Sequence, residues 1–514
     1  IIRLMQLLRL PIGTGSSPQY QDLTFKLNFP SLKRGDISIF GIGGISNVPI
    51  LNAAIDSNDV YAERGRDLYI RTQLGVVGIN HRINTGNRSY LSTTLSQSIQ
   101  NYYSWRDSVA PNNSVLFEDI YLVKEFRAVS SLSSYYNTKI LLKGSKRNTL
   151  LTFRAGARIH GYFINIADYA TYPALRYEYL AERELHFHTE AYAQTMWKFS
   201  DKFSLYAGLY ANHFSINRRS YSVEPRVALH WSPSGRHLFS LGYSWHSRLV
   251  PFIISYYAAP NADGGYDLPN KELGLFKSQH LSLDYRWQIS PNWQWQTNLY
   301  AQYLYDMPIS ANTIDAFSYI NYGENPIFPL RSDLISEGIG YNAGVDVALI
   351  RKFHNGFYMS IGGSYSTSQY KGSDNVWRST AYDIRYLGQA VAGKEWAIGK
   401  MRRNFFTVDL RFNYHHGKPI TPIDTTASIA AGREVAIDQE SYSERMRDYL
   451  RLDFKTGVRF NSRRRRISHN LLIDVINVLG RNNTAQIRYN PVLQRVVEQS
   501  QFGMVPNLMY QLQF

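Results

Sequence analysis

The sequence contains no cysteine, and this absence removes several classes of chemistry. Disulfides, thiolate metal sites and cysteine nucleophiles are all excluded. The chain also lacks any uninterrupted apolar run near the roughly 18–20 residues that a membrane-spanning helix needs. Only 19% of the 514 residues are charged, and the mean hydropathy is −0.32. Neither a helical membrane protein nor a thiol-dependent enzyme is therefore expected.

Motifs for catalysis, cofactors and nucleic acid are missing as well. The net charge of +16 comes from basic residues scattered through the chain, as in "NSRRRR" at 461–466, without a basic domain, so no nucleic-acid partner is predicted. "PIGTGSSP" at 11–18 follows no strand and opens no helix, which argues against a phosphate loop. Because no GxSxG, HExxH or paired-cysteine signature occurs, we assign no catalytic residue, no cofactor and no metal site.

What the sequence does contain is period-two alternation, from about residue 19 to the end. In the segment 449–461 the apolar residues share one parity and the charged or polar residues the other. The apolar set is Leu450, Leu452, Phe454, Val458 and Phe460. The segments 280–290 and 405–414 repeat the pattern, and no comparably long stretch has helical periodicity. The chain is predicted to be all-β.

The connections between these strands alternate in length. Short polar turns are predicted at 31–35, 84–87, 143–148, 200–202, 232–235, 290–292, 354–356, 399–403 and 461–466. Longer connections are predicted at 47–65, 104–120, 166–181, 249–272, 307–335, 372–383, 417–447 and 480–502, with one short exception near 216–221. Short turns at one rim and long loops at the other are typical of outer-membrane barrels, with the short turns periplasmic and the long loops extracellular.

Strand length and polarity decide where the water lies. The strands reach the roughly 9–11 residues that a tilted strand needs to cross hydrocarbon. The polar parity is rich in Arg, Asp, Gln and Asn, which suits a wet lumen, while the apolar parity suits lipid. Pairing into a barrel also satisfies the backbone groups, which lipid cannot do. The predicted fold is a transmembrane up-and-down antiparallel β-barrel.

The strand count predicts missing parts. Nine short turns and the terminal run 503–514 give about 19 strands, whereas bacterial barrels usually have an even number. Three earlier strands would make 22, the number of barrels with a plugged lumen. We expect residues 1–18 to be a lead-in or loop remnant and residues 19–514 to be barrel. Since the chain begins without Met, it is expected to be a processed or truncated product.

Several stretches resemble the TonB-dependent receptors of Bacteroidetes-type bacteria. They are "SVEPRVAL" (222–229), "GYSWHSRLVP" (242–251), "LPNKELGLFKSQHLSLDY" (268–285), "LRLDFKTGVRFN" (450–461), "LLIDVINVLGRNN" (471–483) and the terminal "PNLMYQLQF". The resemblance implies a 22-stranded barrel, an N-terminal plug inside it and a segment that engages an inner-membrane energy-coupling complex. This chain departs from the pattern at its start, where nothing before residue 19 is long enough to be a plug.

The resemblance also implies a function, a location and partners. It implies TonB-dependent active transport of a scarce solute across the bacterial outer membrane, with a ferric siderophore or another metal chelate preferred. The implied partners are outer-membrane lipid, the solute, the TonB complex through the missing N-terminal part, and a surface lipoprotein. Two alternatives stay open: a passive porin-like channel and an outer-membrane hydrolase with rim residues such as His246.

The most suggestive cluster of side chains is "ERELHFHTE" at 182–190. In a strand, Glu184, His186, His188 and Glu190 point to one face. Imidazoles with flanking carboxylates could bind a transition metal or contact a metal chelate in transit. The alternative is that these residues belong to an ordinary polar lumen, bonded to a plug or to water.

Other candidates for solute contact lie near the outer rim. His246 and Arg248 end the strand 236–248, where a structural role is the alternative. The loop rings Tyr256, Tyr257, Tyr319 and Tyr322 could stack on a ligand. The alternative for them is the interfacial aromatic girdle of a barrel, which we predict for Trp231, Trp293 and Trp295.

Overall fold

The structure is a computed structural model of the chain. The residues it describes are 18–30, 34–54, 65–110, 112–142, 149–172, 175–263, 265–323, 331–462, 467–491, 493–501 and 503–514. All but the last residue of the predicted lead-in 1–18, and the arginine run 463–466, lie outside these ranges.

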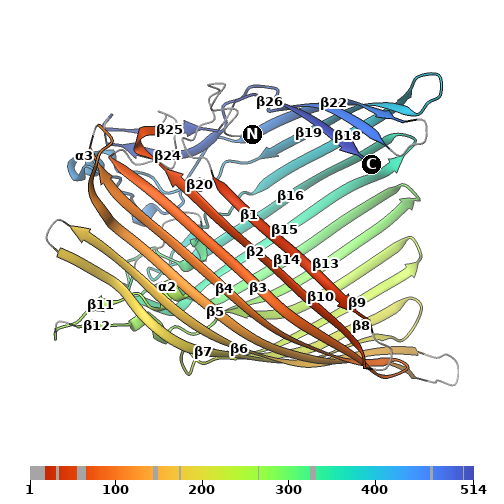
Figure 1. Cartoon of the computed structure of the whole chain (residues 1–514), viewed down its shortest axis with the longest axis horizontal. Coiled ribbons are helices and arrows are strands. Elements are labelled where there is room, and N and C mark those ends of the chain that lie inside the picture. The colour runs from red at the N-terminus through yellow and green to blue at the C-terminus, as the bar shows by residue number, and fades with distance from the viewer. Residues whose placement is uncertain are drawn as a thin grey trace.

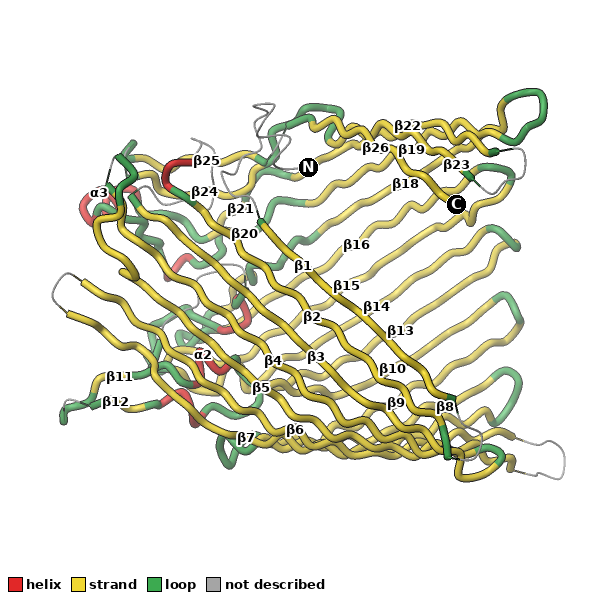
Figure 2. Tube along the Cα trace, viewed as in Figure 1, coloured by secondary structure: helices red, strands yellow, loops and turns green. Residues whose placement is uncertain are grey.

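One antiparallel sheet of 20 strands dominates the described residues, and its strands pair in chain order. The sheet is steeply tilted and curls into the wall of a barrel (Figures 1 and 2). One member, β17 (Trp377–Ser379), is a short strand beside β16, so nineteen strands build the described wall, as the sequence predicted. They are β1 (Gln19–Phe29), β2 (Asp36–Ile50), β3 (Arg66–Gly86), β4 (Ser89–Val109), β5 (Val115–Leu142), β6 (Thr149–Tyr172), β7 (Leu175–Lys198), β8 (Phe203–Phe214), β9 (Tyr221–Ser234), β10 (His237–Arg248), β13 (Phe276–Ser290), β14 (Trp293–Ser310), β15 (Leu334–His354), β16 (Phe357–Lys371), β18 (Tyr386–Ile398), β19 (Asn404–His415), β22 (Tyr449–Asn461), β23 (Ser468–Ile476) and β26 (Val505–Gln513).

Short helices and two-stranded sheets gather at the rim with the long loops, on the left of Figure 1. The helical elements are α2 (Phe252–Ser255), α3 (Thr425–Ala431), η1 (Asn52–Ala54), η2 (Pro269–Glu272), η3 (Tyr319–Asn321) and η4 (Asp438–Glu440). The small sheets pair β11 (Ala259–Pro260) with β12 (Tyr266–Asp267), β20 (Pro419–Ile420) with β21 (Glu444–Arg445), and β24 (Thr484–Asn490) with β25 (Arg495–Ser500). No helix of the described residues is both long and apolar enough to cross a membrane.

Six predicted turns are confirmed, but two predicted long loops are wrong. The connections at 84–87, 200–202, 232–235, 290–292, 354–356 and 399–403 are short and fall at one rim (Figure 2), whereas the turn predicted at 143–148 and most of those at 31–35 and 461–466 lie outside the described residues. The loops predicted at 104–120 and 166–181 are mostly strand, because β4 continues to Val109, β5 begins at Val115, β6 continues to Tyr172 and β7 begins at Leu175. Cross-strand aromatic contacts favour this extension, as where Tyr69 of β3 stacks on its partner Trp105 of β4 at 4.8 Å between ring centroids. Strands β3 to β7 are therefore 21 to 28 residues long.

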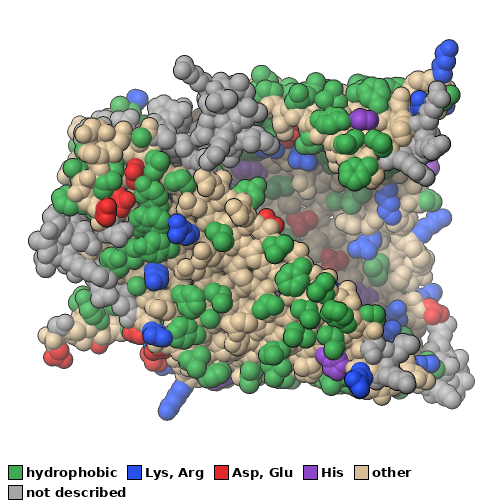
Figure 3. Space-filling view, viewed as in Figure 1, with side chains coloured by type: hydrophobic (Ala, Val, Ile, Leu, Met, Phe, Trp, Pro, Cys, Tyr) green, Lys and Arg blue, Asp and Glu red, His purple; other side chains and the backbone are tan. Residues whose placement is uncertain are grey.

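The two parities of the strands face different surroundings. Large apolar side chains stay 41–49% exposed on the outer face, as at Leu283, Leu410 and Phe460. Figure 3 shows green hydrophobic patches distributed over the outer face of the wall. The inner face carries hydrogen-bonded polar pairs. Asn298 Nδ2 donates to Asp284 Oδ1 at 2.5 Å, and Arg459 Nη2 donates to Glu395 Oε2 at 2.7 Å. This is the polarity of a membrane barrel rather than of a sandwich with a dry centre.

A belt of aromatic rings runs along the outer face beside the short turns. The rings of Phe199, Phe203, Trp231, Phe239 and Tyr285 follow one another at centroid distances of 4.6 to 6.0 Å. Such a belt marks the boundary between hydrocarbon and water in barrels. The predicted girdle position of Trp231 agrees with it.

The wall has two edges within the described residues. There β1 pairs only with β2, and β26 pairs only with β23. The interior is visible between these two edges in Figure 3. That three further strands fill this interval stays a prediction.

Candidate functional site

The inner face of the wall forms a broad polar surface toward the short-turn side. A cavity of about 390 Å³ spans β10, β13 to β16 and β18 on that surface. Its polar lining includes Asp284, Asn298, Asp346, Ser364 and Gln389. Carboxylates, amides and hydroxyls at this density suit a hydrated lumen.

The outer half of the lumen differs, because the connection between β10 and β13 folds into it. We call residues 249–275 the inward loop. Its residues Phe252, Ile254 and Tyr256 are at most 5% exposed and form one apolar cluster with Ile164 and Ile166 of β6, which are completely buried. The inward loop thus packs a dry core against the wall at the outer mouth.

A buried amide ties the inward loop to the next long connection. Asn270 of η2 is fully buried, and its Nδ2 donates to the carbonyl oxygens of Ile254 at 3.0 Å and Arg331 at 2.5 Å. Its Oδ1 accepts the backbone N–H of Leu334 at 3.2 Å. Since every polar atom of this side chain is paired, the two connections are held together as one unit.

The predicted cluster Glu184, His186, His188 and Glu190 does share the lumen face of β7, but the structure divides it in two. Glu184 and His186 are bound to the inward loop: Tyr256 Oη donates to Glu184 Oε2 at 2.8 Å and also bonds His186 Nε2, and Lys271 Nζ lies 2.5 Å from Glu184 Oε1. Burial raises the pKa of Tyr256, and the hydrogen bond to Glu184 adds to the shift, so the hydroxyl keeps its proton. This half of the cluster fastens the loop to the wall.

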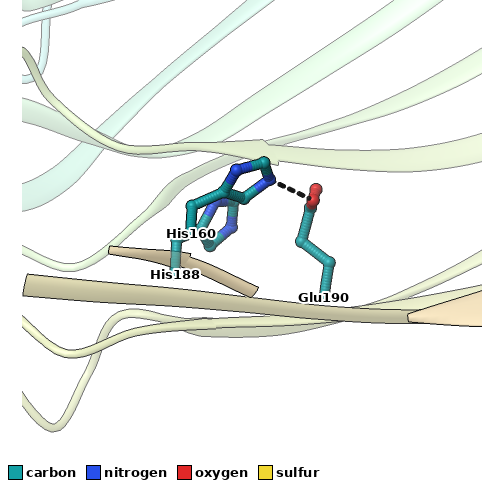
Figure 4. A group of neighbouring side chains, drawn as sticks. All are labelled: His160, His188 and Glu190. Carbon is teal, nitrogen blue, oxygen red and sulfur yellow. Dashed lines mark hydrogen bonds and ion pairs between the residues drawn. The ribbon is translucent and has the colours of Figure 1, made fainter. Parts of the chain in front are cut away.

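The other half, His188 and Glu190, lies next to His160 of β6. His160 pairs directly with His188 across the two strands, and the imidazoles stack at 5.8 Å between centroids. His160 Nε2 lies 3.1 Å from Glu190 Oε2, as the dashed line in Figure 4 shows. One nitrogen of each imidazole and one oxygen of Glu190 lie within 4.8 Å of one another.

His246 and Arg248 end β10 at the rim of another cavity. His246 Nε2 lies 3.0 Å from Ser244 Oγ, and its ring meets that of His280 edge-on at 4.9 Å. His246 lines a cavity of about 690 Å³ with Glu224 and Ser247. Arg248 pairs with Phe276 at the end of the β10–β13 ladder. Within the described residues no hydrogen bond joins His246 to a carboxylate.

The candidate tyrosines lie at different depths. Tyr256 is completely buried in the dry core, whereas Tyr257, the next residue, is half-buried. Tyr319 is 8% exposed and stacks on Tyr322 at 4.7 Å. Tyr322 lines a cavity at the outer mouth.

That cavity, which we call the mouth cavity, has a volume of about 360 Å³ and combines rings with charges. Its aromatic lining is Phe317, Tyr322, Tyr370 and Tyr442, and its charged lining is Asp315, Arg331 and Asp438. Burial raises the pKa of Tyr322 to about 12. Hydrogen bonds from Arg331 hold the pKa of the neighbouring Asp333 below its usual range.

The important residues that sequence analysis missed are His160, Asn270, Lys271 and Arg331. Nothing in the local pattern around any of them shows what lies opposite it in the fold. Finding His160 needs the β6–β7 register, which places it against His188. Asn270 and Lys271 do fall in "LPNKELGLFK", one of the stretches on which the family resemblance rests.

Comparison with known proteins supports the fold through structure alone. No family model and no curated protein matches the sequence. The structure is similar to the ferric-catecholate import receptor Fiu of Escherichia coli K12, with a TM-score of 0.65 at 10% identity over 97% of this chain and 75% of that one. It is also similar to the pyoverdine outer membrane receptor FpvA of Pseudomonas aeruginosa PAO1 (TM-score 0.66, 11% identity, 97% and 71% covered) and to the ferric yersiniabactin uptake receptor FyuA of Yersinia pestis (0.62, 12%, 96% and 71%). At these identities the likeness establishes an outer-membrane receptor fold.

Proposed function

We propose that this chain is the barrel of a TonB-dependent receptor that imports a ferric siderophore or a related metal chelate across the bacterial outer membrane. The observation that carries the proposal is the polar lumen whose outer mouth is occupied by the dry inward loop. A passive channel needs a continuous wet passage, whereas a gated importer needs a mouth that holds solute and then rearranges.

The structural neighbours support the choice of cargo. The three receptors above are described as importing or binding ferric catecholate, pyoverdine and ferric yersiniabactin. Such cargo is a compact chelate with polar and aromatic groups, so rings and charged groups at the outer mouth suit it.

The mouth cavity is the place we propose for first contact with the chelate. Tyr322 and its neighbouring rings offer flat faces for stacking, and Arg331 offers a planar cation for anionic oxygens. Arg331 is bonded to Asp315 at 2.5 Å and to Asp333 at 3.0 Å. An anionic chelate would therefore displace one carboxylate rather than meet a bare guanidinium.

The proposal assigns the remaining candidates to the path below the mouth. His246, Arg248, Tyr257, His188 and Glu190 would be met as the chelate passes inward. Glu184, His186, Tyr256 and Tyr319 would act through the inward loop, because their contacts hold it in place.

We further propose that the full-length protein has a plug domain, three additional strands that make 22, and a segment that binds TonB. We also propose a surface lipoprotein as a partner and a Bacteroidetes-type bacterium as the source. The unpaired edges of β1 and β26 support the additional strands, because lipid-exposed ladder edges are unfavourable.

The test is uptake of radioactive iron by the source bacterium, using a deletion strain complemented with the parent gene. Uptake with a panel of ferric siderophores should require the gene and the proton motive force. Tyr322→Ala should lower uptake at least tenfold, whereas Tyr365→Ala, on the exposed outer face, should leave it unchanged. A large steady conductance in planar bilayers together with uncoupler-resistant uptake would instead identify a passive channel.

The hydrolase alternative has its own measurement. Ser244 and His246 are within hydrogen-bond distance, which is the first requirement for a nucleophile and its base. Hydrolysis of an ester or peptide probe by the purified protein, abolished by His246→Ala, would replace transport with catalysis.

A further inference from the structure

His160, His188 and Glu190, which we call the lumen triad, form a group whose close arrangement goes beyond what contact with a passing chelate requires. The three side chains project from adjacent strands of the inner face, with both imidazoles beside the carboxylate (Figure 4). They lie directly below the dry core, since the ring of His188 is 5.4 Å from that of Phe214. The lumen triad therefore occupies the boundary between the dry and wet parts of the barrel.

The donor set of the lumen triad suits a particular class of ion. Two imidazole nitrogens and one carboxylate oxygen are ligands of borderline divalent metals such as Zn²⁺ and Cu²⁺, and hard ions such as Mg²⁺ prefer oxygen alone. Donor atoms within 4.8 Å of one another need only small side-chain rotations to reach the about 2.0–2.2 Å bonds of such an ion. Three protein ligands leave a fourth position for water or a solute group.

Neighbouring hydroxyls orient the donors of the lumen triad. His160 Nδ1 lies 2.6 Å from Ser131 Oγ, so Nδ1–H can donate a hydrogen bond to the hydroxyl oxygen, which leaves Nε2 unprotonated to bind metal. Tyr210 donates its hydroxyl proton to Glu190 Oε1, which leaves Oε2 directed at the imidazoles. Outer contacts of this kind are what metal-binding histidines and carboxylates commonly have.

The lumen triad can be reached from the wet side. A cavity of about 240 Å³ below it is lined by Glu190, Arg158, Tyr210 and Arg226. Arg158 Nη1 lies 3.7 Å from Glu190 Oε2 and competes with a metal cation for that oxygen. Its side chain is 49% exposed, so it can turn into the cavity when an ion binds.

We propose that the lumen triad is a binding site for a divalent transition-metal ion of the Zn²⁺ or Cu²⁺ class. The ion is held by His160, His188 and Glu190, and its fourth position faces the lumen. Bound there, it links β6 to β7 immediately below the inward loop. The proposal is independent of the transport function, because a resident ion in the wall does not depend on what the barrel carries.

The test uses the full chain, purified with a tag that contains no histidine and stripped with a chelator. Isothermal titration with Zn²⁺ should show one site with a dissociation constant in the low micromolar range or tighter. His160→Ala and Glu190→Gln should each weaken binding at least tenfold. The control is His230→Ala, which removes a histidine hydrogen-bonded to Ser240 and outside the lumen triad.

Two further measurements test whether the three side chains themselves bind the ion. Electron paramagnetic resonance of the Cu²⁺-loaded protein should show coupling to two imidazole nitrogens, and to one in His188→Ala. Glu190→Gln retains the size of the side chain, so a folded variant with weaker binding separates loss of a ligand from loss of the barrel. A dissociation constant above 100 μM for the unsubstituted chain, or equal binding by the variants and the control, would overturn the proposal.

Discussion

The lumen-facing row of β6 passes through two environments. Arg158 and His160 lie in the wet part of the barrel, while Ile164 and Ile166, on the same face of the same strand, are completely buried. The strand geometry is uniform along this row. The difference is made by Phe252 and its neighbours on the inward loop, which cover only the outer end. Alternation therefore fixes which side chains point inward, and a distant segment decides which of them stay in water.

Of the substitutions that test the difference between the dry and wet parts of the lumen, Phe252→Ala is expected to have the largest effect. The ring packs 5.8 Å from Phe214 and 6.2 Å from Tyr162, and removing it leaves a cavity in the dry core. The free energy of releasing the inward loop should fall by about 3–5 kcal/mol. Hydrogen exchange of the α2 amides and tryptic cleavage at Lys271 measure the release.

Its control is Gln389→Ala, which alters the wet part of the lumen. This variant should leave exchange in the inward loop unchanged. Equal effects of the two substitutions would show that the outer and inner halves of the lumen do not differ in packing.

A smaller effect is expected from Tyr256→Phe, which keeps the ring and removes only the hydroxyl. Glu184 loses a hydrogen-bond donor, and His186 loses its contact with the hydroxyl in a buried setting. Release of the inward loop should become easier by about 1–3 kcal/mol. The same exchange experiment measures it, with Tyr365→Phe on the lipid-facing surface as the matched control. An unchanged exchange rate would mean that apolar packing alone holds the loop.

The smallest effect concerns pH at the mouth cavity. Arg331 lowers the pKa of Asp333 in the folded state. The pair therefore contributes its full stabilisation of the connection between β14 and β15 above the ordinary aspartate pKa of about 4. The contribution is lost as the pH falls through the lowered pKa. Comparing wild type with Asp333→Asn by hydrogen exchange should show a difference below about 1 kcal/mol that is flat above pH 4 and shrinks on acidification. A difference that grows in acid would contradict the assignment.

Much of the wall follows from the sequence, since alternation and turn chemistry are local properties. The parity of β22, with Asp453 inside and Phe460 outside, is an example. The ends of β4 to β7 could not be predicted from the sequence. A strand that continues above the membrane has the same kinds of residues as one within it, so the pattern does not show where the strand ends. Tyr69 and Trp105 extend the ladder by stacking on each other, a contact that only the pairing reveals.

The candidate site was also predicted only in part, because alternation is a local property and the contacts that complete the site are not. The common face of Glu184, His186, His188 and Glu190 follows from alternation, but its division between a loop anchor and the lumen triad depends on Tyr256 and His160. Those two residues lie outside the segment 182–190 and reach it through tertiary contacts. The burial of Tyr256 and Tyr319 likewise reflects loop folding, for which the sequence offers no period.

The aromatic belt has a consequence for where the inward loop stands. A tilted strand crosses the hydrocarbon in about ten residues, and on β7 this crossing starts near Trp197, beside the aromatic belt. Farther along the outward row of β7, the exposed Leu185 is followed by the charged Arg183, which marks the outer edge of the hydrocarbon. Ile164 pairs with Glu184 at the same height. Phe214, at the lower end of the packed mouth, pairs with His188 at the height of the lipid-facing Phe187. The part of the packed mouth from Ile164 outward thus lies at the outer edge of the hydrocarbon and beyond it. Its cohesion should obey the rules of water-soluble proteins, including weakening in the cold, while the wall beneath it answers to the bilayer.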